Sequence, residues 1–321
     1  MKSGADTSAS DDRNAFGPPA LALSAGGARG AYQVGCLRAF EERDLSFAAV
    51  AGSSIGALNG AFFIQNLHES AERFWKDLTR SRILSGGDSR TGALPARLAS
   101  DIALLLAPVP GVRAARLIKY ALFTAKLFSK YGAVGSLGRD GFMRIESLQP
   151  LIDRRLDIAE ILKSPVPLFV TVYKAPELKN PRGRSLWFRL QDHDEKDAAR
   201  ILAASMSLPF FFGPVEMKGT AYLDGGLTQW LPIKPLVQSG FRNIIAVALK
   251  PGYAVDPREY PGRRVTVIAP ESRLGRFPLA TFRFTEKAVS KWMAMGYRDA
   301  CRVLDANPLA LEGRSETPVK P

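Results

Sequence analysis

The stretch Phe47-Ala-Ala-Val-Ala-Gly-Ser-Ser-Ile-Gly-Ala-Leu-Asn59 joins a short apolar run to a helical segment. Phe47 to Ala51 is typical of a buried strand, and Ile55 to Leu67 is typical of a helix. Between them, Gly52-Ser53-Ser54-Ile55-Gly56 has the form Gly-x-Ser-x-Gly, with glycines two positions either side of the central serine. A sharp strand-to-helix turn needs such small residues, because a side chain there would strike the neighbouring backbone. The pattern predicts a nucleophile elbow with Ser54 at its apex, although a tight turn capped by a serine would use the same residues.

The elbow belongs to a longer alternation of strands and helices. Leu21 to Ala25 is typical of a strand and Gly30 to Glu42 of a helix, and both precede the elbow. Strands that alternate with helices usually form parallel sheets. The sequence therefore predicts an α/β fold with a mostly parallel central sheet flanked by helices. Further strands are expected at Leu168 to Tyr173, Leu186 to Leu190, Val215 to Leu223, Asn243 to Leu249 and Val265 to Ala269, and further helices at Ala198 to Ala204 and Thr285 to Leu304.

Composition and length restrict the class of protein. A hydrophobic content of 46% rules out intrinsic disorder, and two cysteines are too few for a disulfide scaffold. The 321 residues fit either two domains or one large α/β unit. We expect a disordered lead over residues 1–18, a single domain over 19–306 and a mobile tail over 307–321.

One basic segment interrupts the α/β alternation, and we expect it to form an amphipathic helical insertion at about residues 90–140. Between Arg90 and Tyr131 the only acid is Asp101, whereas seven residues are cationic: Arg90, Arg97, Arg113, Arg116, Lys119, Lys126 and Lys130. The insertion is either a surface helix with a solvated face or a lid that contacts a membrane. The formal net charge of +13 favours an anionic partner and leaves nucleic acid, a membrane surface and an acidic substrate open.

A serine nucleophile needs a base, and the two histidines are poorly placed to supply one. His68 follows Ser54 by 14 residues, which puts it roughly 20 Å along the expected helix. No histidine follows His193, so the order serine, acid, histidine of the α/β-hydrolases cannot be drawn with a C-terminal acid. If Ser54 is catalytic, its base must be another group.

A carboxylate ends one of the expected strands. Asp224-Gly225-Gly226 follows the apolar run Val215 to Leu223. Asp-Gly is a common turn after a strand, but a carboxylate at a strand end can also reach a serine hydroxyl as a base. Partial removal from water would raise its pKa toward the range that this task needs.

A glycine-rich loop, Ser24-Ala25-Gly26-Gly27-Ala28-Arg29-Gly30, lies between the first strand and its helix. Backbone N–H groups at such a helix start suit either a phosphate or the oxyanion of a tetrahedral intermediate. Ala25 replaces the first glycine of the dinucleotide-binding pattern and no Walker sequence occurs, so we expect no nucleotide cofactor. We also expect no metal, because the cysteines and histidines lack ligand spacing.

Four motifs in order resemble the patatin-like phospholipases. They are Leu23-Ser-Ala-Gly-Gly-Ala-Arg-Gly-Ala-Tyr-Gln-Val-Gly35, Gly52-Ser-Ser-Ile-Gly-Ala-Leu-Asn-Gly60, Ala203-Ala-Ser-Met-Ser-Leu-Pro-Phe-Phe-Phe-Gly-Pro-Val215 and Leu223-Asp-Gly-Gly226. The resemblance covers roughly residues 20–306. It implies a Ser–Asp dyad without histidine, in which Ser54 is the nucleophile and Asp224 the base.

The resemblance also implies roles for the residues around the dyad. Backbone amides of Gly26, Gly27 and Ala28 would form the oxyanion hole, and Arg29 would be a loop cation that meets a phosphate head group or braces the loop. The remaining motif positions support the turns: Gly30, Gly52, Gly56, Gly225 and Gly226. Two positions depart from the family, because Ala25 stands in its glycine triplet and Trp230 stands where an Asn often precedes the proline.

These observations predict a serine acyl hydrolase that cleaves fatty-acyl esters of lipids or phospholipids at an anionic membrane surface. The alternatives are an esterase or depolymerase acting on other esters, such as hydroxyalkanoates, and a non-catalytic membrane-binding protein of the same fold. Nucleic acid is not an expected partner, because no nucleic-acid motif accompanies the charge. No signal peptide or membrane-spanning segment is recognised, so we expect a cytoplasmic protein, with peripheral membrane association left open.

Overall fold

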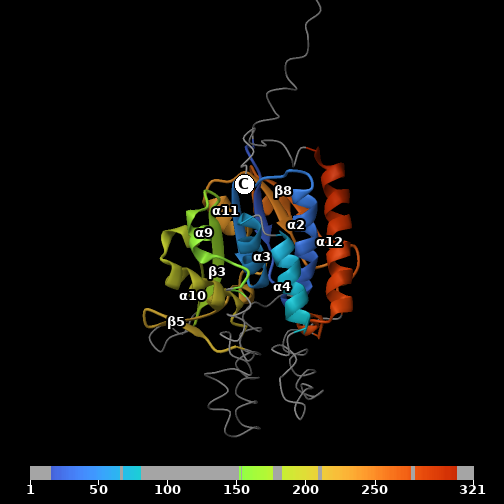
Figure 1. The fold of residues 1–321 in the computed structure, drawn as a ribbon. Coiled ribbons are helices and arrows are strands. Elements are labelled where there is room, and N and C mark those ends of the chain that lie inside the picture. The colour runs from blue at the N-terminus through green and yellow to red at the C-terminus, as the bar shows by residue number, and fades with distance from the viewer. Residues whose placement is uncertain are drawn as a thin grey trace, which may run out of the picture.

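The computed structural model describes residues 16–65, 68–80, 152, 154–175, 183–208, 212–275 and 279–308. Within these ranges a mixed sheet carries helices on both faces (Figure 1). The strands are β1 (Ala20–Leu23), β2 (Ala49–Ser53), β3 (Leu168–Lys174), β4 (Arg184–Arg189), β5 (Val215–Met217), β6 (Thr220–Asp224), β7 (Asn243–Val247) and β8 (Arg264–Ile268). The helices are α2 (Ala31–Glu41), α3 (Ile55–Ile64), α4 (His68–Arg80), α9 (Ile158–Lys163), α10 (Glu195–Met206), α11 (Ile233–Gln238) and α12 (Glu286–Ala306).

The sheet has a parallel centre and an antiparallel side. Its order is β5-β6-β3-β2-β1-β7-β8, with β4 also paired to β3. Strands β3, β2, β1, β7 and β8 run parallel, whereas β4, β5 and β6 form antiparallel pairs. The expectation of an α/β fold with a mostly parallel central sheet is confirmed.

Strand β3 is shared by two strands on one edge. β4 pairs with β3 from Phe169 to Lys174 and so occupies one whole edge. β2 pairs with residues 168–171 and β6 with residues 172–174, so both must lie along the opposite edge. β2 is parallel to β3 and β6 is antiparallel to it, so the carboxyl ends of β2 and β6 meet midway along β3.

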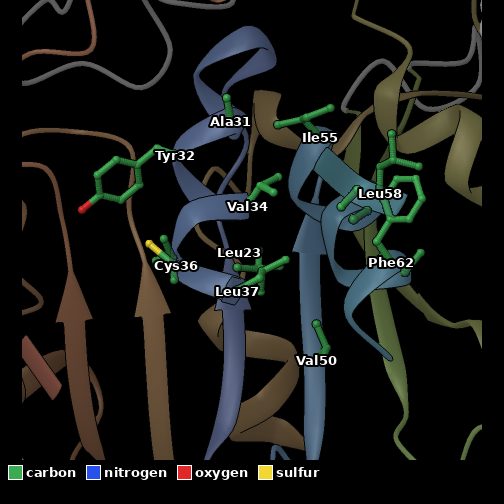
Figure 2. Packing of buried hydrophobic residues seen from close by; sticks show 14 of the residues in the cluster. Leu23, Ala31, Tyr32, Val34, Cys36, Leu37, Val50, Ile55, Leu58 and Phe62 are labelled. Atoms are coloured by element: carbon green, nitrogen blue, oxygen red, sulfur yellow. The ribbon is translucent and has the colours of Figure 1, made fainter. Parts of the chain in front are cut away.

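Alternate residues of the central strands face two different helical layers, as the two-residue period of a strand requires. Leu21, Leu23 and Val50 pack into the larger core beneath α2, α3 and α12. Figure 2 shows α2 and α3 side by side above β1 and β2, with apolar side chains between them and the strands. The smaller core on the other face contains Ala22 and Ala51, with Leu236 of α11 packed against them. The alanines let α11 approach the sheet closely.

Helix α12 packs along α2 through a pair of glycines. A Cβ atom on Gly296 would strike the carbonyl oxygen of Tyr32, and a Cβ on Gly35 would strike that of Met293. The Tyr32 hydroxyl also donates to Asp299 Oδ2 at 2.9 Å. These contacts hold the C-terminal helix against the helix that follows the glycine loop.

Two sequence-based expectations were wrong in detail, and two short helices were not expected. The expected strand Val215 to Leu223 is the hairpin β5–β6, because Lys218 (φ 50°) and Gly219 (φ 72°) adopt left-handed conformations and reverse the chain. The helix after the elbow ends at Ile64, so His68 begins the separate helix α4. Helices α9 and α11 are short and were not expected. The predicted basic insertion at about 90–140, most of the lead at 1–18 and most of the tail at 307–321 lie outside the described residues.

Candidate active site

Ser54 stands between β2 and α3 in a strained backbone conformation. Its φ is 55° and its ψ is −127°, a combination that side chains normally avoid. A Cβ on Gly52 would strike the backbone of Ala57, and a Cβ on Gly56 would strike the carbonyl oxygen of Leu23. Both glycines of the Gly-x-Ser-x-Gly pattern are therefore required by close backbone contacts.

The structure brings Ser54 and Asp224 together across 170 residues of sequence. The Ser54 Oγ–H donates to Asp224 Oδ2 at 2.6 Å. Strand pairing explains the contact, because the ends of β2 and β6 meet on the edge of β3. Both side chains are nearly buried, with exposed fractions of 9% for Ser54 and 3% for Asp224, so solvent does not compete strongly for this hydrogen bond.

Burial alters the acidity of Asp224. Removal from water raises the pKa of Asp224 from 3.8 to about 7. The hydroxyl of Ser54 and the N–H of Gly226, which donates to Asp224 Oδ1 at 2.6 Å, act in the opposite direction by stabilising the carboxylate. The result is a carboxyl group whose pKa lies near neutrality, where a general base is most effective.

The end of helix α10 holds both members of the pair. The N–H of Ser54 donates to Ser205 Oγ at 2.9 Å, and the N–H of Asp224 donates to the carbonyl oxygen of Ser207 at 3.0 Å. Sequence reasoning included these serines in a family motif but assigned them no role. The alternation Ser205-Met206-Ser207 was the available signal, because it places two small polar residues at a helix end.

The glycine loop lies at the start of a short 3-10 helix, Gly27–Gly30. Gly27 has a φ of 56°, and a Cβ there would strike the carbonyl oxygen of Thr281. The first N–H groups of a helix have no partner within it, so Gly26, Gly27 and Ala28 present backbone donors at this turn. The resemblance read from the sequence predicts that these donors form the oxyanion hole.

Arg29 lies within the glycine loop and braces it. Its Nε–H donates to the carbonyl oxygen of Gly26 at 3.2 Å, and burial lowers the pKa of the Arg29 guanidinium to about 10. A guanidinium with this pKa stays charged at neutral pH and keeps a positive charge beside the loop.

The two departures from the family are accommodated here. Ala25 is not among the described non-glycine residues with left-handed backbone, so its methyl group causes no conformational strain. The Ala25 N–H donates to the carbonyl oxygen of Trp230 at 2.8 Å, and the Trp230 ring packs edge-on against Tyr253. This main-chain hydrogen bond joins the loop after Asp224 to the glycine loop.

Gly225 and Gly226 follow Asp224 in tight surroundings. A Cβ on Gly225 would strike the backbone of Thr171. A Cβ on Gly226 would lie 2.5 Å from the Ala25 Cβ and 2.9 Å from Asp224 Oδ1. Because these two glycines have no side chains, the turn can pack closely and hold the Asp224 carboxylate beside Ser54.

A family model described as patatin-like phospholipase matches residues 21–237, a range that contains the elbow, the glycine loop and Asp224. The chain belongs to the patatin-like phospholipase family. Membership supports a hydrolase that acts on lipid acyl esters and confirms the resemblance read from the four motifs.

Two curated relatives of this patatin-like chain share about a quarter of their aligned residues with it. An uncharacterized NTE family protein of Mycobacterium bovis is 26% identical over 240 residues, which cover 75% of this chain and 51% of that protein. A lysophospholipase named NTE1 from Mycosarcoma maydis is 25% identical over 240 residues, covering 75% of this chain and 10% of that protein. The chain thus spans about half the length, or less, of these curated relatives.

The fold of this patatin-like chain also resembles solved structures. Human GIVD cytosolic phospholipase A2 superposes with a TM-score of 0.47 at 10% identity, covering 94% of this chain and 61% of that one. VipD from Legionella pneumophila superposes with a TM-score of 0.45 at 14% identity, covering 90% and 67%.

The second histidine of this patatin-like chain does not hydrogen-bond to the Ser54 hydroxyl or to the Asp224 carboxylate. His193 packs against the ring of Phe188 with centroids 5.4 Å apart. Across the described ranges, no cluster of three or more His, Cys, Asp or Glu residues could hold a metal ion. In the same part of the chain, no helix has both the length and the apolar character needed to cross a bilayer.

Proposed function

We propose that the chain is a serine acyl hydrolase that cleaves fatty-acyl esters of lipids through an acyl-enzyme on Ser54, with Asp224 as general base. The observation that carries this proposal is the 2.6 Å hydrogen bond from Ser54 Oγ to Asp224 Oδ2 at a strained elbow. Membership of the patatin-like phospholipase family supports the lipid class of substrate.

The first half of the reaction forms the acyl-enzyme. Ser54 Oγ attacks the carbonyl carbon of the ester while its proton passes to Asp224. The carbonyl oxygen becomes an oxyanion, which the N–H groups of Gly26, Gly27 and Ala28 stabilise. The tetrahedral intermediate collapses as the C–O bond to the leaving alcohol breaks, and Asp224 returns the proton to that alcohol.

The second half releases the fatty acid. Asp224, ionised again, takes a proton from a water molecule as that water attacks the acyl carbon on Ser54. The bond from Ser54 Oγ then breaks, and the serine recovers the proton from Asp224. A base with a pKa of about 7 fits both halves, because it accepts a proton in one step and gives it up in the next.

We further propose that the enzyme works at an anionic lipid surface. The formal net charge of +13 supports this partner, since cations near an anionic membrane each contribute about 1 kcal/mol of attraction. Hydrolysis that increases when anionic lipid is added to zwitterionic vesicles would support this part of the proposal, and equal rates on both vesicles would contradict it.

The decisive experiment compares the wild type with S54A and D224N on phospholipid vesicles and with a fluorophosphonate probe. We expect the wild type to release fatty acid and to gain the mass of the probe on the peptide that contains Ser54. S53A is the matched control, because Ser53 is the neighbouring serine and is fully buried, so its removal should leave labelling intact. Wild-type hydrolysis by both S54A and D224N would show that the dyad is wrong.

A further inference from the structure

A chain of buried side chains connects helix α4 to both ends of the glycine loop. The Trp75 Nε1–H donates to Asn59 Oδ1 at 3.1 Å. Asn59 Nδ2 donates to Gln33 Oε1 at 2.8 Å and to the carbonyl oxygen of Gly30 at 3.0 Å. Gln33 Nε2 in turn donates to the carbonyl oxygen of Ser24 at 2.7 Å. All three side chains are fully buried, so bulk water does not compete for these bonds.

The groups at both ends of this row of hydrogen bonds fix its direction. An indole nitrogen can only donate a hydrogen bond, whereas the side-chain amides of Asn59 and Gln33 can be turned either way. Because Trp75 donates to Asn59, the amide oxygen of Asn59 must face the indole and its NH₂ group must face the loop. The same logic then turns Gln33, whose NH₂ group must face Ser24. The carbonyl oxygens of Gly30 and Ser24 can only accept, so they require the same orientation of the two amides as Trp75 does.

The chain ends on the carbonyl groups that flank the oxyanion donors. Ser24 begins the loop and Gly30 ends it, and the N–H groups of Gly26, Gly27 and Ala28 lie between them. A peptide group is planar, so fixing the direction of a carbonyl also fixes the N–H of the next residue. Two fixed carbonyls thus hold both ends of the segment that carries the donors.

Trp75 is itself held against the loop. Its ring stacks on Phe284 with centroids 6.0 Å apart and an interplanar angle of 23°. A Cβ on Gly30 would lie 3.2 Å from Trp75 Cζ2, so the indole packs directly against the loop backbone. The tryptophan therefore supports the loop both by packing and through the hydrogen-bonded chain.

We propose that Trp75 is a positioning residue of the oxyanion hole and acts through Asn59 and Gln33 on the carbonyls of Ser24 and Gly30. The inference rests on the proposed function for its effect on catalysis. The part of the proposal that concerns the order of the glycine loop does not depend on catalysis and can be tested by itself.

The test compares W75F with W292F in the full chain. W75F removes the indole N–H and keeps an aromatic ring. Trp292 is also a buried tryptophan, at 4% exposure, so W292F removes the same atoms from helix α12. Two quantities are measured: hydrogen exchange in peptides covering residues 24–31, and the ratio of the rates on an ester and on its thionoester. Sulfur accepts hydrogen bonds poorly, so this ratio reports on the oxyanion donors.

We expect W75F to speed exchange in residues 24–31, to lower kcat on the order of tenfold with KM nearly unchanged, and to lower the ester-to-thionoester ratio. W292F should leave all three near wild type. Equal exchange in the two variants would overturn the proposal, and so would a fall in kcat with an unchanged ratio. Faster exchange in W75F alongside an inactive wild type would instead show that the proposed function fails while the loop positioning stands.

Should W75F fold poorly, Gln33→Met is a second variant, at the other end of the row of hydrogen-bonded side chains. Methionine keeps the length of the glutamine side chain and removes its hydrogen bonds to Ser24 and Asn59. We expect the same changes in exchange and in the rate ratio, and their absence in a folded Gln33→Met protein would overturn the proposal.

Discussion

Ser53 and Asp224 stand opposite consecutive residues on the same edge of strand β3. Ser53 is aligned with Thr171, and Asp224 is aligned with Val172. Ser54 follows Ser53 directly, so the register of the two strands places the serine next to the carboxylate, and the elbow turns its hydroxyl toward Asp224. The pair thus depends on backbone pairing, which is stiffer than a contact between two loops.

The first prediction concerns the pH dependence of the rate. We expect kcat/KM on a neutral, monomeric ester to rise with pH and to level off above an apparent pKa of about 7, because Asp224 must be ionised to accept the serine proton. Initial rates across the range from about pH 5 to about pH 9 measure this. A rate independent of pH in that range would exclude Asp224 as a base with a raised pKa.

The second prediction concerns how the buried carboxylate of Asp224 lowers the free energy of unfolding. The pKa of Asp224 is about 7 in the folded state against 3.8 ordinarily, so between these values the folded protein binds more protons than the unfolded one. The free energy of unfolding therefore falls as pH rises through this window. D224N has no charge to bury and should be more stable than the wild type at about pH 8, by roughly 4 kcal/mol at most.

Denaturant unfolding at about pH 8 and about pH 5 checks this prediction, because the advantage of D224N should shrink as the pH falls. An advantage that stays constant between the two pH values would contradict the assignment of the cost to the buried charge.

The third prediction concerns Ser205, which accepts the N–H of the strained Ser54 at 2.9 Å. S205A leaves that buried donor without its partner, and we expect kcat to fall about tenfold because the elbow is less firmly held. S164A is the matched control, since Ser164 Oγ accepts the N–H of Val166 at 3.2 Å away from the site. Active-site titration with kcat measurements compares the two, and equal kcat values would show that Ser205 does not position the nucleophile.

The fourth prediction concerns the contact between α2 and α12. Gly296→Ala places a methyl group against the carbonyl oxygen of Tyr32, and we expect a loss of about 2 kcal/mol or more in the free energy of unfolding. Ser290→Ala, at an exposed position of the same helix, should stay close to wild type. Chemical unfolding measures both, and equal midpoints would mean that the helices can move apart without cost.

The elbow and the parallel strands could be predicted because short sequence patterns indicate them. The glycines around Ser54 and the two-residue alternation of the strands act over a few residues, so they are visible in sequence. The hairpin β5–β6 was missed because residues 215–223 were predicted as one apolar strand and the polar turn Lys218-Gly219 inside them was not used as a turn signal. His68 was placed in the wrong helix because α3 ends without a strong signal. Gln33, Asn59 and Trp75 were also missed, because their hydrogen bonds join three different helices.

The sequence by itself determined which residue is the candidate nucleophile, which carboxylate ends a strand, and that no late histidine is available. Only the tertiary structure decided that Asp224 reaches Ser54, that Ser205 and Ser207 hold the pair, and that burial raises the pKa of Asp224 toward neutrality. The physical reason is the separation in sequence over which each interaction acts. Backbone turns are governed by neighbouring residues, whereas desolvation and hydrogen bonding depend on groups that the fold brings together from distant parts of the chain.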